Sequence, residues 1–148
     1  MYPNMNNYEE LYRQMELLVS NIEKAINGEY SAVQCYDQLA KLASRQDEKQ
    51  QLQEIRADEQ KHLESFLQIY TSLTGRQYQP KITEECPSVY KEGVELAFRD
   101  EQETVDFYLD IADQANNQFI KDTFRRASAD EQNHAVWFLY FLSKMLSQ

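Results

Sequence analysis

Apolar residues recur along most of this chain at the three- and four-residue spacing that places them on one side of an α-helix. The spacing holds over residues 20–43, 47–74, 88–114 and 118–146. Ser20 stands three residues before Glu23, a capping-box pattern that marks the start of a helix, and Gly75 is suited to end the second helix. The pattern therefore predicts an all-α fold with four long helices.

The same period continues upstream, from Tyr8 to Leu18. This part of the chain is predicted to be either a short separate helix or an extension of the first long helix, and the sequence leaves both alternatives open. We therefore expect a partly helical N-terminal segment over residues 1–19 and a four-helix bundle domain over residues 20–148.

The connections between the predicted helices differ in length. The first and third are only a few residues long, which makes each pair of helices antiparallel neighbours. The middle one, residues 75–87, contains Pro80 and Pro87 and has no helical period. Fully extended, it would span ~43 Å at ~3.3 Å per residue, which is about the length of one helix. It could cross the whole bundle and make the second and third helices parallel, although an up-and-down bundle with a slack loop is the alternative.

Composition agrees with a single all-α domain and narrows the range of partners. The chain has 148 residues, enough for one core, and only three glycines and three prolines to form turns. Its formal net charge is −10 and it has no basic run, so nucleic acid is not an expected partner. No segment approaches the ~20 apolar residues needed to cross a membrane, and no secretory leader is evident. We expect a cytoplasmic protein.

The two cysteines, Cys35 and Cys86, do not form a C-x-x-C pair. Two thiols cannot supply a four-thiolate iron site or a framework of disulfides. We expect Cys35 to lie on the flank of the first helix as a small apolar residue rather than as a redox group.

The two predicted helical hairpins repeat each other at a constant spacing of 72 residues, with no insertion. The repeated polar and tyrosine positions are Glu29 and Glu101, Tyr36 and Tyr108, Asp58 and Asp130, Glu59 and Glu131, and His62 and His134. Apolar positions keep the same register, for example Phe66 with Phe138. The chain is therefore a duplicated hairpin, and the duplication includes the residue types that bind metals.

Each repeated glutamate and histidine lies on the apolar side of its helix, as Glu29 does between Ile26 and Val33. Four carboxylates and two imidazoles are thus directed at a core, where clustered charges are costly unless cations neutralise them. A lone Glu-x-x-His on a helix is often only a surface ion pair. Here both histidines of the chain occur in that motif, which favours a metal site.

Six ligands suit two metal ions. One Glu from each of two helices and Glu-x-x-His from each of the other two is the ligand set of di-iron and di-manganese carboxylate bundles. Oxygen donors outnumber nitrogen donors and no thiolate is present, which favours iron, with manganese as the alternative and zinc as a substitute. We expect Glu59 and Glu131 to bridge the ions, with Glu29 and Glu101 as terminal ligands.

Further residues are placed to support these ligands. Asp58 and Asp130 directly precede the bridging glutamates, where each could accept the free N–H of the histidine across the bundle, or simply face solvent. Tyr36 and Tyr108 lie two turns beyond Glu29 and Glu101. Their hydroxyls could hydrogen-bond a carboxylate of the opposite pair, or their rings could merely pack in the core.

Residues 20–146 resemble the ferritin-like superfamily and, within it, the rubrerythrin-like branch. The closest points of likeness are the spacing from Gly28-Glu29 to Tyr36 and the motif Asp58-Glu59-x-x-His62. The resemblance implies a ferritin-like four-helix bundle, built from two duplicated hairpins joined by a long crossover. It also implies a di-iron centre whose ferrous form reacts with hydrogen peroxide or dioxygen, in defence against oxidative stress.

The sequence departs from that family in two places. Rubrerythrin-type peroxidases generally have a rubredoxin module with four cysteines, which this chain does not contain, so a separate electron-donor protein is expected. They also tend to have an extra glutamate three residues after the ligand of the third helix, where this chain has Thr104. That makes the site more symmetric and closer to bacterioferritin.

Three functions follow as hypotheses: a di-iron oxidoreductase acting on peroxide or dioxygen, an iron-oxidising and iron-handling protein, and a non-enzymatic helical interaction module.

A further expectation concerns assembly. Residues 134–142 are apolar on all sides of the fourth helix, so either the segment from Tyr8 to Leu18 or a second subunit should cover them. We expect a homodimer.

Overall fold

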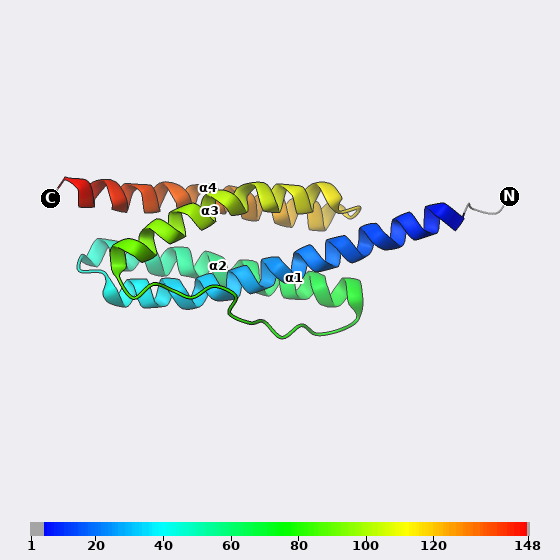
Figure 1. Cartoon of the computed structure of the whole chain (residues 1–148), viewed down its shortest axis with the longest axis horizontal. Helices are drawn as coiled ribbons and strands as arrows, with labels where there is room; N and C mark the ends of the chain where they lie inside the picture. Colours follow the sequence, from blue (N-terminus) through cyan, green and yellow to red (C-terminus); the bar gives the residue numbers. More distant parts are fainter. Residues whose placement is uncertain (1–4, 148) are drawn as a thin grey trace.

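A computed structural model describes residues 5–147, and this part of the chain folds into four helices (Figure 1). Their bounds are α1 Met5–Leu42, α2 Gln46–Thr74, α3 Tyr90–Gln114 and α4 Gln118–Leu146. The expected all-α fold is confirmed, and the last three helices begin and end within two residues of the predicted positions. Residues 1–4 of the expected N-terminal segment lie outside the described range, as does Gln148.

The first helix is longer than the bundle that it joins. α1 runs without a break from Met5 to Leu42, so the segment that the sequence left open is an extension of this helix. In Figure 1 its N-terminal part extends beyond the other three helices. Its side chains are exposed up to Leu17, and Leu18 is the first that is buried, where the helix enters the bundle.

Local chemistry explains where the helices end. Gly75 takes the left-handed conformation, with φ 69°, and its N–H donates to the carbonyl of Thr71, which closes α2. At the start of α4, the side chain of Asn117 accepts a hydrogen bond from the N–H of Ile120 at 3.1 Å.

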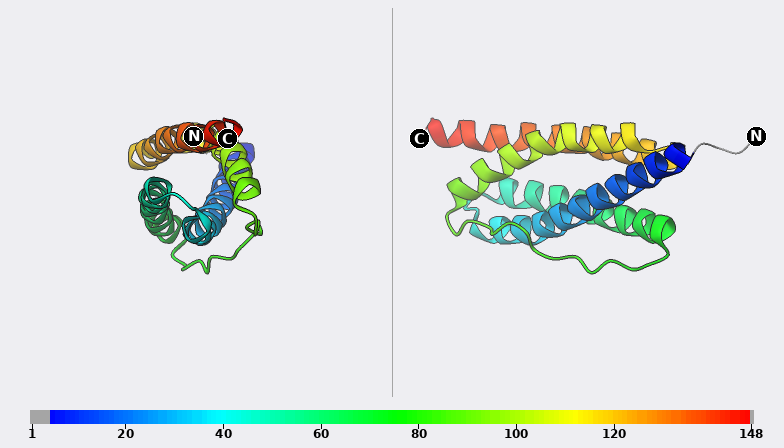
Figure 2. Two further views of the ribbon diagram at one scale, coloured as in Figure 1. Left: turned by 90° about the vertical axis from the view of Figure 1, so that its left-hand side faces the viewer. Right: turned by 45° about the vertical axis from the view of Figure 1, so that its right-hand side comes forward.

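The middle connection is a crossover. Residues 75–89 run along the outside of the bundle from the end of α2 to the start of α3, at the opposite end (Figure 1). α2 and α3 are therefore parallel, whereas the α1–α2 and α3–α4 pairs are antiparallel hairpins. The end-on view in Figure 2 shows the helices around a common axis with the crossover outside them. This is the ferritin-like connectivity, and the up-and-down alternative is wrong.

The core divides into two apolar clusters along the bundle axis. One is centred on Phe66 and Phe124, and the other on Leu39 and Phe138. In every helix the repeated glutamate falls between residues of the first cluster and residues of the second. A polar layer thus lies at mid-bundle, closed on both sides by apolar side chains.

The crossover is attached to α1 by polar contacts from buried side chains. Asn27 accepts a hydrogen bond from the N–H of Lys81 at 3.0 Å and donates to the hydroxyl of Tyr78 at 2.9 Å. Ser31 accepts from the N–H of Thr83 at 3.0 Å. These contacts explain why two polar residues are buried on the inner half of α1.

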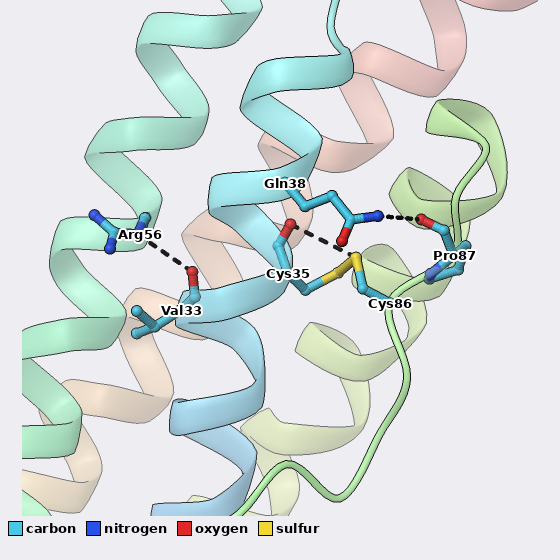
Figure 3. Close-up of a disulfide and its surroundings, with 6 residues drawn as sticks. All are labelled: Val33, Cys35, Gln38, Arg56, Cys86 and Pro87. Carbon is cyan, nitrogen blue, oxygen red and sulfur yellow. Dashed lines mark hydrogen bonds between the residues drawn. A yellow bond between two sulfur atoms is a disulfide. The ribbon is translucent and has the colours of Figure 1, made fainter.

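A disulfide between Cys35 and Cys86 links α1 to the crossover (Figure 3). The Cα atoms are 5.2 Å apart, although the residues are separated by 51 positions in sequence. The expectation that Cys35 is only a small apolar residue is wrong. Cys86 lies beside Cys35 because the crossover runs back along α1. The spacing of the two cysteines in the sequence does not predict this path.

Within residues 5–147, no helix has a stretch long and apolar enough to cross a membrane.

Candidate metal centre

The polar layer contains all six side chains that the sequence predicts as ligands. None is more than 7 % exposed, and five are 1–2 % exposed. They are Glu29 from α1, Glu59 and His62 from α2, Glu101 from α3, and Glu131 and His134 from α4. Each glutamate lies in the interior of its helix, well away from both ends, so the bundle itself holds these groups in place.

The six residues form two groups, each with one donor atom per residue and all donor atoms within 4.8 Å of one another. One group is Glu29, Glu59, His62 and Glu131, and the other is Glu59, Glu101, Glu131 and His134. Glu59 and Glu131 belong to both groups. That is the arrangement which carboxylates bridging two ions would need, although the ligand roles themselves stay predictions.

Each of the six side chains also has one buried polar atom that finds no hydrogen-bond partner among residues 5–147. These atoms are Glu29 Oε2, Glu59 Oε1, His62 Nδ1, Glu101 Oε2, Glu131 Oε1 and His134 Nδ1. Buried polar atoms are nearly always paired, because leaving one unsatisfied costs ~1–3 kcal/mol. Six such atoms, aimed at one place and chemically suited to hard cations, fit a pair of metal ions.

The histidines are held so that Nδ1 faces the centre. Nε2 of His62 lies 2.8 Å from Asp130 Oδ2, and Nε2 of His134 lies 2.9 Å from Asp58 Oδ2. Both contacts join α2 to α4 across the bundle, as the sequence suggested. Each aspartate accepts the Nε2 proton and leaves Nδ1 available as a metal ligand. Nε of Arg126 donates a hydrogen bond to Asp130 Oδ1 at 3.0 Å, and the sequence did not predict this contact.

The tyrosines connect the two halves of the repeat. Tyr36 donates its hydroxyl proton to Glu101 Oε1 at 2.6 Å, and Tyr108 donates to Glu29 Oε1. Burial and the nearby carboxylates raise the pKa of both tyrosines well above the ordinary value, so the hydroxyls remain protonated donors. Each terminal glutamate is thus oriented by a tyrosine from the opposite hairpin.

Burial and close packing shift the pKa values of most groups in the cluster toward the protonated form. Burial, and then the charge of Glu59, raises the pKa of Glu29 and of Glu101, whereas the pKa of Glu59 is lowered by His134 and His62 in opposition to its burial. Burial works against protonated histidine, but Asp130 and the nearby carboxylates of Glu29 and Glu59 raise the pKa of His62 to about 12. Metal ions would have to displace these protons in order to bind.

A cavity of about 180 Å³ lies beside the centre, between α1, α3 and the crossover. All four glutamates line it, and so do Cys35, Cys86, Glu84, Asp100 and Thr104. Burial, and then a hydrogen bond with Glu84, raises the pKa of Asp100 to about 8. Sequence reasoning missed the cysteines and acids of this wall, because the crossover that brings them together has no periodic pattern.

The aspartate contacts lead to a prediction for Asp130→Asn. The amide lacks the negative charge that strengthens His62 as a ligand, so iron should bind ~10–100-fold more weakly. Competition with a chromophoric chelator measures the affinity. Asp106→Asn, on the exposed surface of α3, is the matched control and should bind iron as the wild type does. Equal affinities for the two variants would contradict the assigned role of Asp130.

A bundle of two antiparallel hairpins joined by a crossover, with a carboxylate and histidine layer at its centre, defines a ferritin-like protein. Residues 92–148 match the family model described as Rubrerythrin. The uncharacterized protein YhjR of Bacillus subtilis strain 168 is 53% identical over 135 residues, which cover 91% of this chain and 93% of that protein. The chain belongs to the rubrerythrin-like branch of the ferritin-like superfamily.

Solved structures agree with this assignment. A ferritin-like, diiron-carboxylate protein of Bacillus anthracis strain Ames has a TM-score of 0.76 and 25% identity, over 87% of this chain and 97% of that one. The bacterioferritin of Desulfovibrio desulfuricans has a TM-score of 0.77 and 19% identity, over 91% of this chain and 83% of that one. At that lower identity the likeness concerns the fold.

Proposed function

We propose that this protein is a di-iron oxidoreductase that reduces hydrogen peroxide, or dioxygen as the alternative oxidant, in defence against oxidative stress. The observation behind the proposal is the set of six unpaired, buried donor atoms in two groups that share Glu59 and Glu131. His62 and Glu29 would complete the site of one ion, and His134 and Glu101 that of the other. Iron in these sites would supply two electrons and Lewis acidity.

The protein's own residues would position and shield this chemistry. Tyr36 and Tyr108 orient the terminal glutamates, while Phe66 and Phe138 are fully buried on either side of the polar layer. The cavity beside the site has room for a molecule as small as peroxide or dioxygen.

Ferroxidase activity with iron handling is the second candidate, and Thr104 is the observation that favours it. Its hydroxyl donates to the carbonyl of Asp100 at 2.6 Å, so this position offers the centre no seventh carboxylate. The ligand set therefore keeps the symmetry of the repeat, with one histidine and one terminal glutamate on each side.

Anaerobic loading with Fe(II), followed by peroxide or by dioxygen, separates the two candidates. An oxidoreductase should oxidise about two irons per chain, react faster with peroxide, and turn over when a reductant is supplied. Continued oxidation and retention of many irons per chain would favour the ferroxidase. If neither peroxide nor dioxygen changes the absorbance of the loaded protein, both candidate functions are contradicted.

We also propose that the protein is cytoplasmic, that it receives electrons from a separate donor protein, and that it assembles as a homodimer.

The argument for a dimer is an exposed apolar surface on the outer face of α4. Val136, Leu139 and Tyr140 on this face are 50–58% exposed. The segment from Tyr8 to Leu18 does not cover them, because it lies at the opposite end of the bundle (Figure 1).

A second copy of the chain would cover this face. Light scattering should give a mass of twice 17.6 kDa. Leu139→Lys should reduce the mass to that of one chain, since burying the added charge in the interface is unfavourable. A wild-type mass of one chain would contradict the dimer.

A further inference from the structure

We propose that Cys35 and Cys86 are a redox-active pair that passes two electrons to the oxidised metal centre of the same chain. The pair would alternate between a dithiol and the disulfide seen in Figure 3. This inference rests on the proposed function, because it requires a centre that an oxidant has oxidised. It assigns to the chain itself the last step of electron delivery.

The location of the pair is the first argument. Both cysteines line the cavity that is also lined by Glu29, Glu59 and Glu101. Cys35 is joined through the backbone to Tyr36, whose hydroxyl donates to Glu101 at 2.6 Å. One peptide bond, one aromatic side chain and one short hydrogen bond thus connect a sulfur-bearing residue to a carboxylate of the centre.

Access from solvent is the second argument. The crossover residues just before Cys86, from Lys81 to Glu85, are exposed, and both cysteines are only half-buried. An external dithiol could attack the disulfide from outside, whereas the cavity side of the same disulfide faces the metal centre. A purely structural bridge would not need to line a cavity that reaches four buried carboxylates.

The surroundings also keep the two sulfurs together once the bond is opened. The crossover stays attached to α1 through the contacts of Asn27 and Ser31, and Gln38 donates to the carbonyl of Pro87 at 3.3 Å. Sγ of Cys86 lies 3.6 Å from the carbonyl oxygen of Cys35, where a reduced thiol could donate its proton (Figure 3). The pair can therefore open and close with little movement of the backbone.

The electron count is balanced. Peroxide would take two electrons from a ferrous pair held by the six buried side chains, together with two protons, and leave as two waters. The thiols of Cys35 and Cys86 then lose two protons to solvent and two electrons to the ferric ions, and their sulfurs join as a disulfide. An external dithiol reduces that disulfide by exchange and becomes a disulfide itself. The net reaction converts peroxide and one dithiol into two waters and one disulfide.

A single-turnover experiment tests the relay. The protein is reduced, loaded anaerobically with Fe(II), freed of reductant and mixed with stoichiometric peroxide. Absorbance of the ferric centre reports the metal, while quenching with iodoacetamide and mass spectrometry report the free thiols. In the wild type, the absorbance should rise and then decay without added reductant, as both thiols become unavailable for alkylation.

Cys35→Ser and Cys86→Ser are the matched variants. In both, the absorbance should rise as in the wild type but lose its decay phase. Every sample starts with the disulfide open, so the reduced wild type, checked by circular dichroism, controls for folding without the bridge. Metal-free wild type treated with the same peroxide should keep its thiols on this timescale.

Two outcomes would overturn the relay. In one, the ferric absorbance persists in the wild type and both thiols remain free, so the bridge is structural only. In the other, the metal-free protein forms the disulfide equally fast, so peroxide acts on the thiols directly. If no ferric absorbance appears with peroxide or, in a parallel sample, with dioxygen, the proposed function fails, and this result is distinct from failure of the relay.

Discussion

Glu59→Gln is expected to abolish stoichiometric iron binding, reducing about two irons per chain to none. Glu59 belongs to both donor groups, and its Oε1 lies 3.0 Å from His134 Nδ1 and 3.5 Å from His62 Nδ1. An amide has no charge to share between two cations, so both sites lose a ligand in a single substitution. Metal analysis after anaerobic Fe(II) loading and gel filtration measures the result.

Two further variants make this prediction specific. Glu29→Gln removes a ligand that belongs to one group only, so this variant should keep about one iron per chain. Glu54→Gln changes an exposed glutamate on the same helix as Glu59 and should bind iron as the wild type does. Circular dichroism should show unchanged helix content in all three variants.

Several results would count against the assigned ligands. Retention of two irons by Glu59→Gln would mean that the bridging assignment is wrong. Equal losses in Glu29→Gln and Glu59→Gln would mean that the two sites do not differ as proposed. A wild type that takes up no iron would favour a helical interaction module, the third function that the sequence left open.

The helices were predictable because apolar spacing depends only on which side of each helix is buried. The N-terminal half of α1 shows the limit of that signal. Tyr8, Leu11 and Met15 keep the helical period, yet they are 59, 54 and 44% exposed. Periodicity indicates a helix with one apolar side, but it does not say whether the same chain covers that side.

The buried cluster of carboxylates and imidazoles was predictable for a different reason. Glutamate and histidine are rarely buried, so their presence on apolar stripes is informative even without coordinates. The repeat adds a second constraint, since Glu29 and Glu101 occupy equivalent positions and must meet near the same axis. Distances were not needed to identify the six residues, although only the structure shows which atoms lack partners.

The cavity wall could not be predicted in this way. Cys35 and Cys86 are 51 residues apart, and their meeting depends on the route of the crossover along α1. That route is fixed by single contacts, such as those of Asn27 and Ser31, rather than by a repeating pattern. Irregular segments leave no periodic signal, so the residues that they bring to a site remain hidden in the sequence.

The two hairpins differ at some equivalent core positions, and these differences should affect the free energy of unfolding. Phe66 and Phe138 are equivalent and both are fully buried. Phe66 stacks on Phe124, with ring centroids 4.2 Å apart, and meets the edge of Tyr108 at 5.3 Å. The position in the first hairpin equivalent to Phe124 is Leu52, so Phe138 has no matching aromatic stack there.

Phe66→Ala should therefore lower the free energy of unfolding more than Phe138→Ala does. Either substitution leaves a cavity and should cost ~3–5 kcal/mol, which lowers Tm by about 6–20 °C for a domain of this size. Loss of the Phe124 stack should make Phe66→Ala the more severe by ~0.5–1.5 kcal/mol.

Urea denaturation of the metal-free protein measures these effects, because bound metal would otherwise add its own stabilisation. Phe119→Ala is the surface control. Its ring is 66% exposed, and the substitution should change stability by no more than ~0.5 kcal/mol. If Phe138→Ala proves as damaging as Phe66→Ala, then the stack of Phe66 on Phe124 adds no more than the edge contact of Phe138 with Phe141.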